Sequence, residues 1–361
     1  MTERHLCSST TVLLLVPVLL LGCLDLQSRS VSDPFLVQFS TDTLLTYDLK
    51  GKLHVHSDSL GNPTDLAIGE KYIFVGEPYA DHPVAVFDRD SGEFIAYVGD
   101  QGKGPREISF LWSMDFKPGN DSGWIYSYPR VMKFLDDLSI TDKTIRLTGA
   151  GSPMSPVWIA GERIASTGGY ESGRVGFYAS TGEFVRTMGP DPPGEPPTPM
   201  VVRQHVYEAI LKTNSDGTRI VVASQNTDRI ELFDASEMLH LVRGPGFHEP
   251  VFSFNIDSNG DPRMMVENET IQGYVSVAVT DHIIFALYSG RSRGWVRSQG
   301  YFSPPAKTVI AFTWNGYPIG VLGIEDGAMD IGVSSDGQFL YAIYRRPVPM
   351  VLRYEVPSLR K

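Results

Sequence analysis

The sequence predicts an all-β fold, a six-bladed β-propeller, and three observations lead to this prediction. First, from Phe35 onward the chain consists of short runs rich in Val, Ile, Phe and Tyr, separated by Gly, Asp, Asn and Pro, which is typical of strands joined by turns. Second, a strand–turn–strand segment recurs along the chain. Third, the recurrences are roughly 40 to 55 residues apart, which is the length of one four-stranded blade.

The recurring segment is a hairpin that runs from one glycine to another. Residues 91–99 read SGEFIAYVG, residues 181–189 read TGEFVRTMG, and residues 315–323 read NGYPIGVLG. Weaker copies end at Gly149 and Gly244. A glycine in the turn accepts a positive φ without steric cost, so each copy predicts a tight hairpin between two strands.

We expect five complete blades and a sixth that the two chain ends share. The five cover residues 64–99, 110–149, 155–189, 205–244 and 272–323, with insertions at 249–271 and 290–306. The sixth runs from Ala328 to about Pro357 and has only three strands of its own. We expect an N-terminal strand within Tyr47–Val55 to complete it, which closes the ring and removes exposed sheet edges. Two separate β-domains would need a linker, and the sequence has no such segment.

The first 22 residues have the pattern of a lipoprotein signal peptide. The apolar run Leu13–Leu21 is too short for a membrane span, which needs ~20 residues, but it suits the hydrophobic core of a signal peptide. It ends in Leu-Leu-Gly-Cys, the bacterial lipobox, with Cys23 as the residue that receives the lipid. The region before it is only weakly basic, because Glu3 offsets Arg4.

The alternative is an ordinary signal peptide with an incidental cysteine. Against it, Cys7 and Cys23 are the only cysteines, so the mature chain would keep one thiol at its N-terminus with no disulfide partner. We therefore expect a signal peptide at 1–22, a lipidated tether at 23–34 and the propeller at 35–361. The net charge of −11 makes nucleic acid a poor partner, because an acidic surface repels phosphates.

The stretch 102–107 after the first blade carries a family resemblance. It reads GKGPRE, where bacterial six-bladed β-propeller lipoproteins of the TolB-like or NHL-like type usually show Gly-x-Gly-Pro-Gly-Glu, so Arg106 replaces a glycine. The segments 285–290 and 340–344 are also similar to that family. The resemblance covers most of the mature chain and implies the propeller fold. It implies no catalytic motif.

Two loops carry the candidate ligand-contacting residues. In the loop 99–108, the backbone amides with Lys103 and Arg106, beside Glu107, could hold an anionic group; the alternative is a connector whose Gly and Pro only set the turn. In the loop 290–297, Arg291 and Arg293 precede Trp295 and Arg297 follows it. Arg291, Arg293 and Trp295 are the candidates for binding an acidic or stacking ligand; the alternative is a solvated loop.

Three motifs that could carry chemistry fail on their context. Residues 290–294 match G-x-S-x-G, but that motif needs a helix after the turn, and residues 294–305 show no helical pattern. Residues 257–261 begin like a calcium loop, yet lack its Gly and Glu positions. His54 and His56 share a strand face without a third ligand. We expect neither a metal nor another cofactor.

Two functions remain open from the sequence. The first is a non-enzymatic binding or scaffold module, held at the membrane by its N-terminal lipid, that contacts a protein, peptide or glycan. The second is a metal-dependent hydrolase or lyase with its site in the central channel, as in lactonase-like propellers. Leu24 follows the cysteine, where Asp would be the usual inner-membrane retention signal, so we expect the outer membrane, with the domain outside the cytoplasm.

Overall fold

The computed structural model describes residues 34–116, 122–127, 131–136, 138–161, 163–194, 197–234, 237–301 and 303–359. The signal peptide and Cys23 lie outside these residues, so the lipidation remains a prediction. The residues from Pro34 onward form one compact unit. Within the described residues, no helix is both long and apolar enough to cross a membrane.

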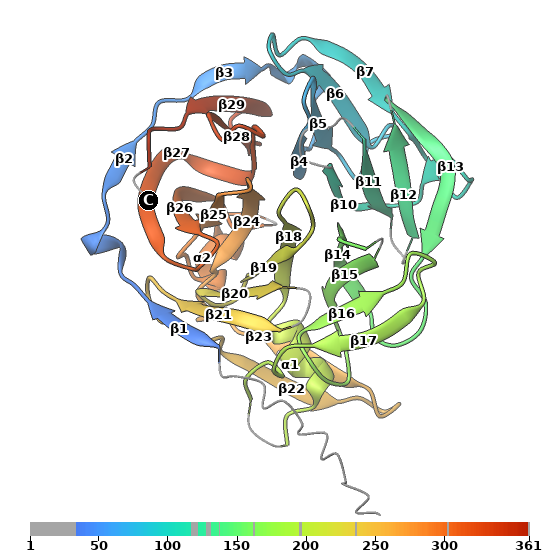
Figure 1. Cartoon of the computed structure of the whole chain (residues 1–361), viewed down its shortest axis with the longest axis vertical. Coiled ribbons are helices and arrows are strands. Elements are labelled where there is room, and N and C mark those ends of the chain that lie inside the picture. The colour runs from blue at the N-terminus through green and yellow to red at the C-terminus, as the bar shows by residue number, and fades with distance from the viewer. Residues whose placement is uncertain are drawn as a thin grey trace, which may run out of the picture. The chain divides into compact units, whose positions relative to one another are not determined.

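Six antiparallel blades, the last two of them in one continuous sheet, stand around a common centre, which confirms the predicted propeller (Figure 1). Blades 1 to 3 are separate four-stranded sheets, and the strands of each blade are given from the centre outward. Their strands are β4 (Asp65–Ile68), β5 (Tyr72–Gly76), β6 (Val84–Asp88) and β7 (Phe94–Val98) in blade 1; β10 (Leu111–Phe116), β11 (Gly123–Ser127), β12 (Val131–Asp136) and β13 (Ser139–Arg146) in blade 2; β14 (Pro153–Ile159), β15 (Arg163–Gly168), β16 (Val175–Tyr178) and β17 (Phe184–Met188) in blade 3.

Blades 4 to 6 have the same order of strands, but a long strand links the last two. Blade 4 contains β18 (Ala209–Thr213), β19 (Arg219–Ser224), β20 (Arg229–Asp234) and β21 (Met238–Arg243), and blade 5 contains β24 (Tyr274–Val279), β25 (Ile283–Tyr288), β26 (Ala306–Thr313) and the first part of β27 (Pro318–Val333). The rest of β27 pairs with β28 (Phe339–Tyr344) and is the first strand of blade 6. β29 (Met350–Glu355) then pairs with β28.

The N-terminal segment runs along the outside of blades 4 to 6, where it is drawn in blue (Figure 1). β3 (Lys52–Val55) pairs antiparallel with β29 and is the fourth strand of blade 6. β1 (Phe35–Gln38) pairs in parallel with β21, and β2 (Thr46–Asp48) pairs in parallel with β27. These two strands were not predicted. They cover the outer edges of blades 4 and 5, which would otherwise expose unpaired backbone groups.

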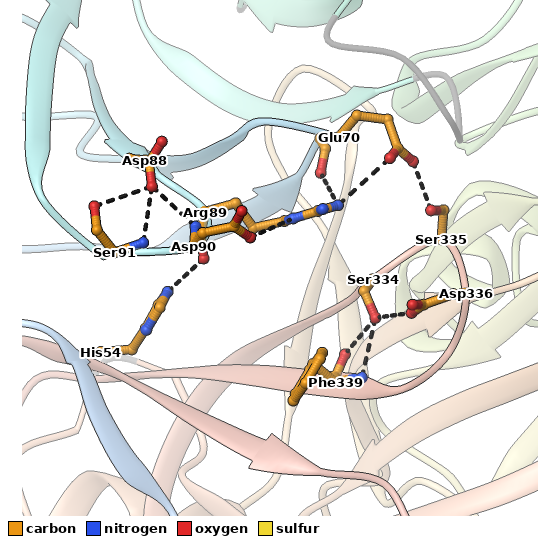
Figure 2. A network of polar contacts seen from close by, with 11 residues as sticks. His54, Glu70, Asp88, Arg89, Asp90, Ser91, Ser334, Ser335, Asp336 and Phe339 are labelled. Atoms are coloured by element: carbon orange, nitrogen blue, oxygen red, sulfur yellow. Dashed lines mark hydrogen bonds and ion pairs between the residues drawn. The ribbon is translucent and has the colours of Figure 1, made fainter.

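Polar contacts tie β3 and blade 6 to blade 1 (Figure 2). The His54 Nε2 of β3 lies 2.7 Å from the Arg89 carbonyl oxygen of blade 1, a distance that places the ring proton on this nitrogen. Burial lowers the pKa of His54, so the ring makes this contact as a neutral donor. Ser335 of blade 6 donates to Glu70 of blade 1 at 2.5 Å.

Short elements interrupt the blade pattern. Two 3-10 turns, η1 (Thr41–Thr43) and η2 (Ser57–Ser59), follow β1 and β3, and the two-residue strands β8 (Asp100–Gln101) and β9 (Glu107–Ile108) join blades 1 and 2. Helix α1 (Met200–Val206) precedes blade 4, and the hairpin of β22 (Phe252–Ile256) and β23 (Pro262–Val266) follows it. Helix α2 (Arg293–Ser298) lies within blade 5. The hairpin and α2 fall in the two predicted insertions.

The apolar core lies between neighbouring blades. Phe74 of blade 1 stacks on Phe116 of blade 2 with ring centroids 4.1 Å apart, and both side chains are buried. Strands inside a blade are buried on both faces, so β5 and β6 are apolar almost throughout. The innermost strands leave a narrow space at the centre.

Candidate functional site

The first strands of the six blades line a central channel, and four of the six junctions between neighbouring blades share one type of hydrogen bond. In it, a polar side chain near the start of one strand accepts from a backbone N–H of the next blade. These bonds are Leu66 N to Asp330 Oδ2 at 2.6 Å, Met114 N to Asp65 Oδ2 at 2.7 Å, Leu211 N to Ser155 Oγ at 3.2 Å and Ile331 N to Ser276 Oγ at 3.1 Å. In blade 3 the matching residue is Pro156, which has no N–H to donate.

Lys212 extends into the channel from blade 4 and is surrounded by carboxylates. Its Nζ donates to Asp115 Oδ2 of blade 2 at 3.1 Å. Burial would lower the pKa of Lys212, but Asp115, together with Asp65 and Asp330, outweighs burial and raises it. Lys212 is therefore a fixed positive charge that bridges the channel.

Asp65 of blade 1 and Asp330 of blade 6 form a carboxyl pair in the channel. Both residues are half-buried. Burial, followed by the charge of Asp330, raises the pKa of Asp65 well above its ordinary value, and burial also raises the pKa of Asp330. Two buried carboxyl groups in contact cannot both ionise at low cost, so we expect this pair to hold one proton between them.

One end of the channel opens into a pocket of about 320 Å³. It lies where the first strand of a blade turns into the second, and all six blades contribute to its wall. Its acidic and basic residues are Asp115, Asp216 and Lys212, and its aromatic residues are Phe116, Trp124 and Trp158. The remaining polar side chains are Thr213, Asn214, Ser215 and Ser335. We call this space the channel pocket.

The channel carboxylates are arranged around the chain's own Lys212 ammonium and not as a set of metal ligands. Among the residues that the structure describes, no group of three or more His, Cys, Asp or Glu side chains is arranged to hold a metal ion. The Asp115, Asp65 and Asp330 carboxylates instead act on the Lys212 ammonium. A divalent cation would have to displace this charge.

The predicted loop 99–108 uses its polar groups for its own structure. Arg106 donates to both carboxylate oxygens of Asp142, at 2.8 and 2.9 Å, and Glu107 Oε2 accepts from Gly104 N at 2.7 Å. Lys133 donates to the carbonyls of Gly104 and Pro105 at 3.3 and 2.8 Å. Lys103 is exposed. These contacts favour the interpretation of the loop as a blade-to-blade connector.

The predicted loop 290–297 brings two of its three candidates together. The Arg291 guanidinium lies 4.3 Å from the Trp295 ring and pairs with Asp326 at 2.6 Å. Arg293 begins α2, and burial, assisted by Arg297, lowers its pKa. None of the six predicted loop residues is among those that line the channel pocket.

One expectation for this loop was wrong. Residues 294–305 showed no helical pattern, yet α2 covers Arg293–Ser298. The helix is less than two turns long, too short to display periodicity. Ser292 is its N-cap, with Oγ accepting from Trp295 N at 3.2 Å. The serine of the G-x-S-x-G match thus caps a helix.

Sequence reasoning did not single out Asp65, Asp115, Lys212 or Asp330. A signal was present: Asp65-Leu-Ala-Ile and Asp330-Ile-Gly-Val repeat one pattern at the start of a blade's first strand. An aspartate repeated in a buried strand predicts an inward-facing polar site.

The fold and its channel define a six-bladed propeller with a pocket at one end of the central axis. The model of the TolB-like 6-blade propeller-like family matches residues 62–336, more than half of the chain. The chain therefore belongs to this family. No curated protein matches the chain.

Proposed function

We propose that the protein is a lipid-anchored envelope protein whose propeller is a non-enzymatic binding module, with the channel pocket as its ligand site. The observation that carries this proposal is the pocket itself, an open cavity whose wall comes from the first strands and turns of all six blades. Sites built on rigid strands hold their geometry, and propellers place ligands where the blades converge.

The chemistry of the channel supports binding over metal-dependent hydrolysis. A hydrolytic metal needs free carboxylate or imidazole donors and an open coordination position. In the channel, Asp115 pairs with Lys212 at 3.1 Å, and Asp330 accepts from Leu66 N, Ile331 N and the Ser276 hydroxyl. These carboxylates are therefore already engaged by backbone N–H groups, a hydroxyl and the Lys212 ammonium.

The anchor in this proposal is the lipidated Cys23, which places the domain in the cell envelope outside the cytoplasm, at the outer membrane. Support comes from the lipobox and from Leu24 in the position that follows it. The test is labelling of expressing cells with radioactive palmitate. Label on the wild-type chain and none on Cys23→Ser would support the anchor, and equal label on both would contradict it.

Filling the channel pocket with a large side chain tests whether it is the binding site. Ala160 lies half-exposed in the pocket wall, so Ala160→Trp should fill the opening. Ala80, also half-exposed, lies in the loop between β5 and β6 away from the channel pocket, and Ala80→Trp is the matched control. Native mass spectrometry of protein purified from membranes should show a co-purifying mass that Ala160→Trp loses and Ala80→Trp retains. A mass retained by both variants would place the ligand elsewhere.

A further inference from the structure

We propose that the channel pocket selects a small ligand that carries a protonated amino group beside an apolar or aromatic body. This inference deepens the proposed binding function and depends on it. It follows from the balance of charge around the pocket and from the composition of its walls.

The first step is the charge of the wall. Of the ionisable side chains that line the pocket, Asp115 and Asp216 are acidic and Lys212 alone is basic. Lys212 is already paired with Asp115 at 3.1 Å, so the pair contributes no net charge. Asp216 therefore adds a negative charge to the wall, although Arg219, which does not line the pocket, acts on the same carboxylate.

The second step is the charge of the Asp65–Asp330 pair, which we call the floor of the pocket. Even with one proton between them, Asp65 and Asp330 add negative charge to the channel, close enough to act on Lys212. The buried charges of this pair are weakly screened by water, whereas the charge of the exposed Asp216 is screened more. A ligand in the pocket thus experiences a negative field mainly from the Asp65–Asp330 pair, to which Asp216 adds a smaller contribution.

Asp216 keeps its charge at neutral pH. Its Oδ1 accepts from the Thr218 backbone N–H at 2.9 Å and from the Thr218 hydroxyl at 2.5 Å. The hydrogen bonds from Thr218 lower the pKa of Asp216. The exposed Ser215 adds a hydroxyl at the same turn, which can accept from one of the three donors of an ammonium group.

The third step is the aromatic wall. Phe116, Trp124 and Trp158 line the pocket, and aromatic faces attract cations as well as apolar groups. Phe116 and Trp124 are only 6% and 5% exposed, so the half-buried Trp158 presents most of the aromatic surface. Trp158 already contacts one cation, the Lys143 ammonium at 5.6 Å from its ring. The Trp124 Nε1 donates to the Pro156 carbonyl at 3.4 Å, so this indole has its own polar partner within the protein.

An anionic ligand fits this pocket poorly. To reach Lys212 it would have to compete with Asp115 and approach the Asp65–Asp330 pair. Uncompensated like charges disfavour binding strongly in a poorly hydrated site. An ammonium group is attracted instead, by both Asp216 and the Asp65–Asp330 pair.

The test uses three probes of nearly the same shape: phenethylamine, its neutral isostere 2-phenylethanol, and phenylacetate. The full mature protein in detergent is titrated with each by calorimetry at pH 7, in a buffer without primary amines. We expect phenethylamine to bind about tenfold more tightly than 2-phenylethanol, with phenylacetate weakest. Ala160→Trp should abolish binding, and Ala80→Trp should not change it.

A charge variant separates a local effect from a global one. Asp216→Asn should reduce the preference for the amine over the alcohol several-fold, whereas Asp58→Asn, an exposed residue outside the channel pocket, changes the net charge equally and should not. Equal binding of alcohol and amine, or tighter binding of phenylacetate, would overturn the cation selectivity while leaving the pocket as a binding site. No binding of any probe at millimolar concentration would also overturn it. The co-purifying mass lost in Ala160→Trp then decides separately whether the pocket binds another ligand.

Discussion

Two groups of carboxylates inside the propeller show opposite responses to burial. Glu231 is sealed between blades 3 and 4, where Arg174 Nε lies 2.5 Å and Arg229 Nε lies 3.2 Å from its oxygens. The charges of Arg174 and Arg229 outweigh burial and lower the pKa of Glu231. In the channel, burial raises the pKa of both Asp65 and Asp330.

The difference lies in the ratio of charges. Glu231 has two guanidinium groups for one carboxylate, whereas the channel has one lysine for three carboxylates. Burial penalises every charge, and only a sufficient number of opposite charges reverses the penalty. The interblade cluster is therefore a structural anchor. The channel cluster keeps a proton and an excess of negative charge next to a pocket, where a ligand can respond to both.

The largest effect is expected from breaking the interblade cluster. Glu231→Gln removes the charge that balances Arg174 and Arg229, and Arg174 is 2 % exposed. Leaving buried guanidinium groups without a counter-charge costs about 3–5 kcal/mol. Urea unfolding followed by tryptophan fluorescence measures this loss.

The control for Glu231→Gln is Glu355→Gln. Glu355 pairs with Lys52 on the surface, where both side chains are more than two-thirds exposed. The same chemical change there should leave the urea midpoint unchanged. Equal midpoints for the two variants would contradict the anchoring role of Glu231.

The next effect separates the two members of the channel pair. Asp330 accepts from the Leu66 and Ile331 N–H groups and from the Ser276 hydroxyl, so it acts as the ionised acceptor. In Asp330→Asn an amide NH₂ would face a donor, which should cost about 1–3 kcal/mol of unfolding free energy. Urea unfolding at pH 7 measures it, and an unchanged midpoint would place the shared proton on Asp330 instead.

An effect of opposite sign, with a distinct pH dependence, is expected for Asp65→Asn. Asp65 accepts from Met114 N at 2.7 Å and donates the shared proton to Asp330. An asparagine reproduces both bonds, with its carbonyl oxygen as acceptor and its amide as donor. The variant should therefore fold as well as the wild type at acidic pH.

The sign of the pH dependence follows from the raised pKa of Asp65. The folded state keeps a proton that the unfolded chain loses above its ordinary value of 3.8. The stability from this proton is complete below that pH and falls by about 1.4 kcal/mol per pH unit until the folded pKa is reached. Asp65→Asn lacks this loss, so its advantage over the wild type should grow from pH 4 upward. Parallel curves from pH 4 to pH 8 would contradict the shared proton.

The sequence predicted the parts of this protein that depend on local chemistry. Gly92 and Gly182 have φ of +75° and +91° in their hairpin turns, so the repeated glycines in the sequence mark the hairpins of the blades. The repeats also predicted strands of blade 6 beyond residue 336, where the family match ends. β1 and β2 escaped prediction because each has at most four residues and pairs in parallel with a distant strand.

The channel site depends on long-range geometry. Asp65 and Asp330 are separated by most of the chain, and only the arrangement of blades 1 and 6 as neighbours brings them together. Lys212 and Asp115 belong to blades 4 and 2, with blade 3 between them. A single sequence shows that each residue interrupts an apolar strand. It contains no information on which interruptions meet at the centre.

The smallest effect is expected where the sequence placed a ligand-contacting residue. Arg106 pairs with Asp142 through two hydrogen bonds, one more than Arg174 makes with Glu231. Both Arg106 and Asp142, however, are about 70 % exposed. Water and salt screen such a pair, and holding two long side chains in one geometry offsets what attraction remains. Arg106→Ala should therefore leave the urea midpoint unchanged, whereas Arg174→Ala should lower it strongly. If Arg106→Ala also lowered the midpoint strongly, then the number of hydrogen bonds, rather than exclusion from water, would determine the strength of an arginine–carboxylate pair in this propeller.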